Sequence, residues 1–137
     1  MSCVITLTLN PCLDQITWVD RVRPNRKLRN DQPRYDPGGG GVNVSRAISR
    51  LGGQTSACYT HGGPVGQQLT QLLEEENIVC LPVAIDGHTR INPNIFERES
   101  NDLYRFIMPG PELAPDVIDL CVNRIEAADV EYAYLVV

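Results

Sequence analysis

Two kinds of hydrophobic pattern alternate along the 137 residues of the chain. Short apolar runs that end at glycine or proline are typical of buried strands, and apolar residues that recur every three to four positions are typical of amphipathic helices. The pattern predicts strands at 4–9, 56–59, 78–85 and 131–137, and helices at about 42–51, 65–76 and 115–128. This alternation predicts an α/β fold with a largely parallel sheet. We expect the run at 78–85 to break at Pro82.

Four further extended segments are more polar and do not flank the predicted helices. They lie at 13–22, 27–35, 89–97 and 103–108. A second, smaller and mostly antiparallel sheet is the natural place for them. Pro93 inside the third segment favours an edge strand or a bulge, and the residues at 100–102 predict a hairpin turn before the fourth.

Four consecutive glycines, Gly38 to Gly41, stand directly before the first predicted helix. Glycine backbone adopts positive φ and lets a ligand approach closely. The first N–H groups of a helix lack intrahelical partners and favour an anion or a hydroxyl-rich ligand. The run matches neither a phosphate-binding P-loop nor the G-x-G-x-x-G dinucleotide fingerprint. A tight strand-to-helix turn is the alternative explanation of the same glycines.

Composition and charge narrow the class of partner. The chain has 12 basic and 17 acidic residues and a net charge of −5, which is a poor electrostatic match for nucleic acid. No apolar run approaches the roughly 20 residues of a membrane span, and the N-terminus has no signal-peptide pattern. The five cysteines are widely scattered, which argues against a disulfide framework or a zinc site. We therefore expect a cytoplasmic protein with reduced cysteines and no protein-bound metal.

Two sets of polar residues are candidates for ligand binding. Asp14 follows the strand-ending Asn-Pro, and Asn43 lies in the first helical turn after the glycines. A carboxylate and an amide that converge on one crevice bind vicinal sugar hydroxyls well, because each makes two hydrogen bonds. Lys27, Arg90 and Arg105 are suited to a phosphate clamp. Cap and turn residues, or solvated cations, are the alternatives for these positions.

Together these motifs resemble a known family. The segments T-L-T-L-N-P-C-L-D at 6–14, G-G-G-G-V-N-V-S-R-A-I at 38–48 and Y-R-F at 104–106 are similar to those of the ribokinase/PfkB carbohydrate kinases. Within that family the chain most resembles the minor-type ATP-dependent 6-phosphofructokinases. The 1-phosphofructokinases and tagatose-6-phosphate kinases share much of the same pattern.

The resemblance implies a Rossmann-like (ribokinase-like) three-layer core, here incomplete, with a small β-sheet lid that often forms a homodimer contact. The core would comprise about 1–11, 36–86 and 109–137, and the lid about 12–35 and 87–108. In this family Asp14, Gly39, Gly40 and Asn43 would hold the sugar, and Lys27, Arg90 and Arg105 would hold its phosphate.

The activity that the resemblance implies is transfer of the γ-phosphoryl group of Mg-ATP to a ketohexose phosphate. Fructose 6-phosphate is the expected acceptor and fructose 1,6-bisphosphate the expected product. The family's catalytic aspartate belongs to a G-A-G-D motif that this sequence lacks. We therefore expect the N-terminal, sugar-phosphate-binding part of such an enzyme, inactive alone, with no catalytic residue and no complete ATP site. A non-catalytic sugar-phosphate-binding or lid-pairing module is the alternative.

Overall fold

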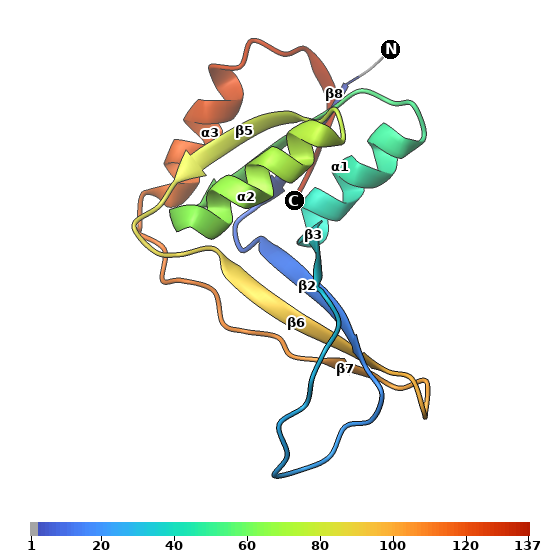
Figure 1. Ribbon diagram of the computed structural model, residues 1–137. Coiled ribbons are helices and arrows are strands. Elements are labelled where there is room, and N and C mark those ends of the chain that lie inside the picture. The colour runs from blue at the N-terminus through green and yellow to red at the C-terminus, as the bar shows by residue number, and fades with distance from the viewer. Residues whose placement is uncertain (1–2) are drawn as a thin grey trace.

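The computed structural model describes residues 3–137 (Figure 1). Four parallel strands form its core sheet in the order β5-β4-β1-β8. Their bounds are Cys3–Thr8 for β1, Thr55–His61 for β4, Val79–Ala84 for β5 and Tyr132–Val136 for β8. The helices of the described chain are α1 (Gly40–Arg50), α2 (Gly63–Glu75) and α3 (Val117–Glu126). The predicted α/β fold with a parallel sheet is confirmed.

Alternate residues of the central strands pack on opposite faces of the core sheet. On one face, the buried Cys58 of β4 packs against Cys121 of α3. On the other face, the fully buried Tyr59 packs with Val42 of α1 and Leu69 of α2. Helices therefore cover both faces of the sheet, α1 and α2 on one and α3 on the other (Figure 1). This is the three-layer arrangement that the sequence predicts.

A second sheet, here called the lid sheet, extends away from the core below α1 and α2 in Figure 1. Its order is β3-β2-β6-β7, with bounds Arg34–Gly38, Cys12–Val19, Arg90–Glu97 and Leu103–Arg105. The pairs β2–β3 and β6–β7 are antiparallel, whereas the central pair β2–β6 is parallel. The mostly antiparallel second sheet is present, and the hairpin turn expected at 100–102 lies before β7, with Asn101 at a φ of 61°.

Both proline expectations are wrong. β5 runs through Pro82, because β5 is an edge strand of the core sheet and one of its sides carries no ladder. Pro93 lies in β6, an internal strand of the lid sheet. Its carbonyl accepts from Phe106 N–H at 2.9 Å and therefore points toward the β7 side of β6. The Pro93 nitrogen, which carries no hydrogen, points to that same side, where β7 has already ended. The ladder between β2 and β6 loses no bond.

The extended segment predicted at 27–35 is also wrong for most of its length. Residues 20–33 form a loop between β2 and β3, and the strand begins only at Arg34. β3 then continues to Gly38, so the glycine run starts inside a strand of the lid sheet. A polar, arginine-rich segment without alternating apolar residues has no face to bury, which explains why it does not join the sheet.

A partly buried ion pair fixes α1 against the end of α2. Arg46 donates from Nε to both carboxylate oxygens of Glu76 at 2.9 Å and from Nη2 to Oε1 at 2.7 Å. Its Nη1 also donates to the Pro37 carbonyl at 2.7 Å, which ties β3 to the same cluster. Glu76 is the C-cap residue of α2, where an acid opposes the helix dipole. The bond to Arg46 accounts for an acid at this position.

Replacing Glu76 by Gln should lower the free energy of unfolding at pH 7 by roughly 2 kcal/mol, because it leaves a partly buried guanidinium without its charge partner. The hydrogen bonds from Arg46 hold the pKa of Glu76 below its usual range. A lowered pKa means that this stability is present at neutral pH and is lost as the pH falls through the folded-state value. Urea unfolding at pH 7 and pH 3 should therefore show a difference that shrinks in acid.

The neighbouring Glu75→Gln is the matched control, since Glu75 contacts only the exposed Gln71 among the side-chain hydrogen bonds found. We expect its effect to stay within about 0.5 kcal/mol. Equal losses for Glu75→Gln and Glu76→Gln would contradict the role given to the Arg46–Glu76 pair.

Candidate functional site

The turn from β3 into α1 presents the start of a helix. β3 ends at Gly38, Gly39 is the N-cap residue with a φ of 121°, and α1 begins at the exposed Gly40. Asn43 N–H donates the first intrahelical bond, to the Gly39 carbonyl at 2.8 Å. The Gly40 N–H comes before this first bond in the chain, so no carbonyl of the helix accepts from it. It therefore lies where the start of a helix favours an anion or a hydroxyl.

Glycine is required at some of these positions and not at others. A Cβ at Gly38 would lie 2.6 Å from both Asp14 Oδ2 and Cys12 Sγ, so the glycine allows Asp14 to lie against the turn. Gly39 has a φ that residues with side chains rarely adopt. A Cβ at Gly40 would meet no atom within 4 Å. Packing therefore does not require glycine at 40, whereas close approach of a ligand would.

One face of the lid sheet carries a row of polar side chains. Cys12 and Asp14 of β2 pair with Arg90 and Asn92 of β6, and paired residues on neighbouring strands point to the same face. Asn94 is on this face too, because side chains alternate along a strand. Asp14 therefore lies between the glycine turn on one side and the polar residues of β6 on the other.

Asn94 connects Asp14 to Arg105. Its Nδ2 donates to Asp14 Oδ1 at 3.4 Å and to the Asn92 carbonyl at 3.1 Å. Its Oδ1 accepts from Arg105 Nε at 3.3 Å. A carboxylate and a guanidinium are thus held on the same face of the lid, joined by a single amide side chain.

Arg90 already makes bonds to the backbone. Its Nη1 donates to the Met108 carbonyl at 2.9 Å, and its Nη2 donates to the Asn10 carbonyl at 3.1 Å. Its Nε is buried without a partner in the described chain. Each terminal nitrogen of a guanidinium carries two protons, so these bonds orient Arg90 and leave donors for an anion.

Lys27 does not join these residues. It lies in the loop of residues 20–33 and lines a hollow with Val19, Asp20 and Glu99. Val19 is five residues beyond Asp14 on β2, which corresponds to roughly 17 Å along a strand. In Figure 1 this loop is at the lowest point of the lid, away from the helices.

The structure thus brings most, but not all, of the predicted site residues to one place. Asp14, Arg90 and Arg105 share the lid face, while Gly39, Gly40 and Asn43 form the adjoining turn. Sequence reasoning missed Cys12, Asn92 and Asn94. The available signal was the alternation of Arg90, Asn92 and Asn94 at every second position, which places three polar side chains on one face of a strand.

Burial sets the protonation of the thiol next to Asp14. Desolvation, with the charge of Asp14 as a second cause, raises the pKa of Cys12 to about 11. The thiol therefore stays protonated at neutral pH and donates to Asp14 Oδ1 at 3.6 Å. Asp14 Oδ1 has two donors from the protein, Cys12 and Asn94, while Oδ2 faces the glycine turn.

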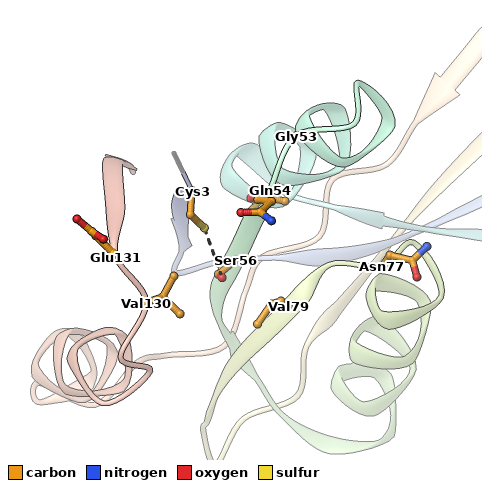
Figure 2. A pocket seen from close by; sticks show the side chains of 9 residues that line it. Cys3, Gly53, Gln54, Ser56, Asn77, Val79, Val130 and Glu131 are labelled. Carbon is orange, nitrogen blue, oxygen red and sulfur yellow. Dashed lines mark hydrogen bonds between the residues drawn. The ribbon is translucent and has the colours of Figure 1, made fainter. Parts of the chain in front are cut away.

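A separate hollow of about 390 Å³ lies at the opposite end of the core strands (Figure 2). It is lined by Cys3, Ser56, Val79 and Glu131, at or next to the amino ends of the parallel strands. Open α/β sheets bind ligands at the carboxyl ends of their strands, where Thr8 of β1 leads to the lid. The hollow therefore lies apart from the site described above.

Two further features are absent from residues 3–137. No group of three or more His, Cys, Asp or Glu side chains lies close enough together to hold a metal ion. None of the helices in this range combines the length and the apolar character that crossing a bilayer requires.

The model of the pfkB family of carbohydrate kinases matches residues 7–135. The chain belongs to this family. It is 40% identical over 133 residues to the ATP-dependent 6-phosphofructokinase isozyme 2 of Mycobacterium tuberculosis, covering 97% of this chain and 39% of that protein. It is 32% identical over 109 residues to the 1-phosphofructokinase of Xanthomonas campestris, covering 80% and 34%. The chain thus spans about two fifths of the length of the first relative.

Solved structures agree with this family assignment. The phosphofructokinase-2 of Escherichia coli in complex with fructose-6-phosphate is similar with a TM-score of 0.89 and 38% identity, over 98% of this chain and 44% of that one. The tetrameric inhibited form of the same enzyme gives a TM-score of 0.90 and 36% identity, over 99% and 45%. The ribokinase-like fold that the resemblance implies is confirmed.

Gly41→Ala should destabilise the fold, whereas Gly40→Ala should not. A Cβ at Gly41 would lie 2.5 Å from Thr8 Oγ1 and 2.8 Å from the Leu7 carbonyl, which overpacks the contact between α1 and β1. Thermal or urea unfolding should show a loss of about 2 kcal/mol for Gly41→Ala and a change within about 0.5 kcal/mol for Gly40→Ala. Equal losses for both variants would contradict the packing described here.

Proposed function

We propose that this chain supplies the sugar-phosphate acceptor site of an ATP-dependent kinase, with fructose 6-phosphate as the acceptor. The observation that carries the proposal is the joined pair of Asp14 and Arg105 on the lid face that meets the glycine turn. A hydroxyl-binding carboxylate beside a phosphate-binding guanidinium matches the two ends of a phosphorylated sugar. Fructose 1-phosphate and tagatose 6-phosphate are the alternative acceptors.

The residues divide into two groups in this proposal. Asp14 Oδ2 and the side-chain amide of Asn43 bind ring hydroxyls, and the backbone at Gly39 and Gly40 lets the ring approach the start of α1. Arg105 and Arg90 bind the phosphate that the sugar already carries, and Arg90 is oriented for this by its two carbonyl bonds. These groups hold the acceptor hydroxyl in place for in-line attack, which lowers the entropic part of the barrier.

Mg-ATP would supply the phosphoryl group and the metal ion for the reaction. The transfer also needs a base for the proton of the acceptor hydroxyl and donors for the charge on the transferred group. We assign neither role to a residue of the proposed site, and in this proposal the chain binds and positions the acceptor. We expect the 137-residue chain alone to show no turnover of ATP with fructose 6-phosphate in a coupled phosphotransfer assay, and turnover by the pure chain would contradict this.

Calorimetric titration with fructose 6-phosphate tests the binding site. Asp14→Ala and Arg105→Ala should each weaken binding 10- to 100-fold, because each removes a hydrogen bond to or from a charged group, worth about 1.5–3 kcal/mol. Gly40→Ala should weaken binding as well, although it leaves the fold intact. Gln15→Ala is the control, since Gln15 lies on the opposite face of β2, where it donates to Tyr35 Oη. Unchanged affinity in both Asp14→Ala and Arg105→Ala would rule the site out.

Lys27 belongs to the proposal in a different way. Its distance along the lid sheet from Asp14 means that it would meet the bound phosphate only from a second copy of the chain. We propose a homodimer through the lid sheets, whose edge strands β3 and β7 have free ladder sides. The tetrameric form of the E. coli enzyme supports association in this family.

Sedimentation of the protein with and without Lys27→Ala separates assembly from binding. Lys27→Ala should leave the dimer unchanged and weaken fructose 6-phosphate binding several-fold, because one cation contact is lost. A protein that stays monomeric, and whose sugar-phosphate affinity does not respond to Lys27→Ala, would contradict the proposed dimer and the role of Lys27 together.

A further inference from the structure

Asn94 is a buried amide in the middle of the lid face. It is 7% exposed and lies on β6, an internal strand, so solvent does not satisfy its polar atoms. Both ends of the side chain instead bond to residues of the proposed site. A buried amide with satisfied bonds at both ends fixes the positions of its partners, because breaking either bond leaves a buried polar group unpaired.

The chemistry of the partners decides the orientation of the Asn94 amide. The carboxylate of Asp14 only accepts hydrogen bonds, and the guanidinium of Arg105 only donates them. The Asn94 Nδ2 must therefore face Asp14, and its Oδ1 must face Arg105, as the structure has them at 3.4 and 3.3 Å. A flipped amide would place donor against donor at one end and acceptor against acceptor at the other.

These two bonds select which atoms of the partners remain for a ligand. At Asp14 they occupy Oδ1, together with the Cys12 thiol, and leave Oδ2 at the glycine turn. At Arg105 they occupy Nε and leave the two terminal nitrogens, the pair that binds a phosphate in bidentate fashion. The separation between the free carboxylate oxygen and the free guanidinium nitrogens is thus set through one side chain.

We propose that Asn94 is a positioning residue that sets the span between the hydroxyl-binding and the phosphate-binding ends of the site. Through this span it selects the position of the phosphate on the sugar, for example a ketohexose 6-phosphate over a 1-phosphate. The inference rests on the proposed sugar-phosphate site. Asn94 touches no reacting atom in this account and acts through Asp14 and Arg105.

The test compares two Asn94 variants in the protein as its gene encodes it. Asn94→Leu keeps a side chain that branches at Cγ and removes both hydrogen bonds, while Asn94→Ala removes the branched side chain and the bonds together. Dissociation constants are measured by calorimetry for fructose 6-phosphate, fructose 1-phosphate and inorganic phosphate. Both variants should bind the preferred sugar phosphate at least 10-fold more weakly and inorganic phosphate less than 3-fold more weakly. The ratio of the dissociation constants of the two sugar phosphates should fall at least 5-fold in both variants.

Gln15→Ala removes an amide hydrogen bond from the opposite face of the same sheet and should leave all three constants unchanged. If Asn94→Leu keeps the wild-type preference, the hydrogen bonds of Asn94 do not set it and the inference is wrong, while the proposed function stands. If the wild-type protein binds neither sugar phosphate, the proposed function and the inference fail together.

Discussion

The site depends on the absence of a side chain at Gly38. The antiparallel pairing of β2 with β3 places Gly38 opposite Cys12, on the face that also carries Asp14. A Cβ at this position would lie 2.6 Å from an oxygen of Asp14 and from the thiol of Cys12. A residue with a side chain here would require the side chains of Asp14 and Cys12 to move away from the turn. The contact between the lid sheet and the helix therefore tolerates only glycine there without rearrangement.

Several buried polar contacts hold α1 in place for this contact. The hydroxyls of Thr6, Ser45 and Thr55 form a chain, with 2.8 Å from Thr6 to Ser45 and from Ser45 to Thr55, which joins α1 to β1 and β4. Val42 N–H donates to the Thr8 hydroxyl at 3.0 Å, so a residue of β1 satisfies one of the unpaired amides at the helix start. The Arg46–Glu76 pair adds a link to α2. The helix that offers its first amides to a ligand is thus fixed from three neighbouring elements.

Local sequence signals predicted the local parts of this arrangement. The glycine run and the periodic apolar residues after it indicated a strand-to-helix turn, and Asp14 and Asn43 were identified beside it. Of the residues that were missed, Cys12 is on the same strand as Asp14, whereas Asn92 and Asn94 reach the site only through pairing between distant strands. Asn94 meets Asp14 across 80 positions in the chain, and the parallel register of β2 with β6 that joins them leaves no local mark.

At Lys27 and Pro93 a local sequence signal is present, but it does not specify where the residue lies in the lid sheet. A cluster of cations indicates an anion but does not indicate which end of a sheet carries it, and the loop with Lys27 lies beyond the end of β2 that is remote from Asp14. Pro93 is typical of an edge strand, yet it is accommodated in an internal one because β7 ends beside it. Both outcomes follow from strand lengths and pairing, which composition does not specify.

The central claim is that the start of α1 and the polar face of the lid form one binding site. An NMR titration of the ¹⁵N-labelled protein with fructose 6-phosphate tests it most directly. The account predicts that the backbone amides of residues 38–43, the Asn94 side-chain amide and the Arg105 Nε–H shift together and saturate with one dissociation constant. Shifts confined to the loop of residues 20–33, or to the hollow at the amino ends of the core strands, would contradict it.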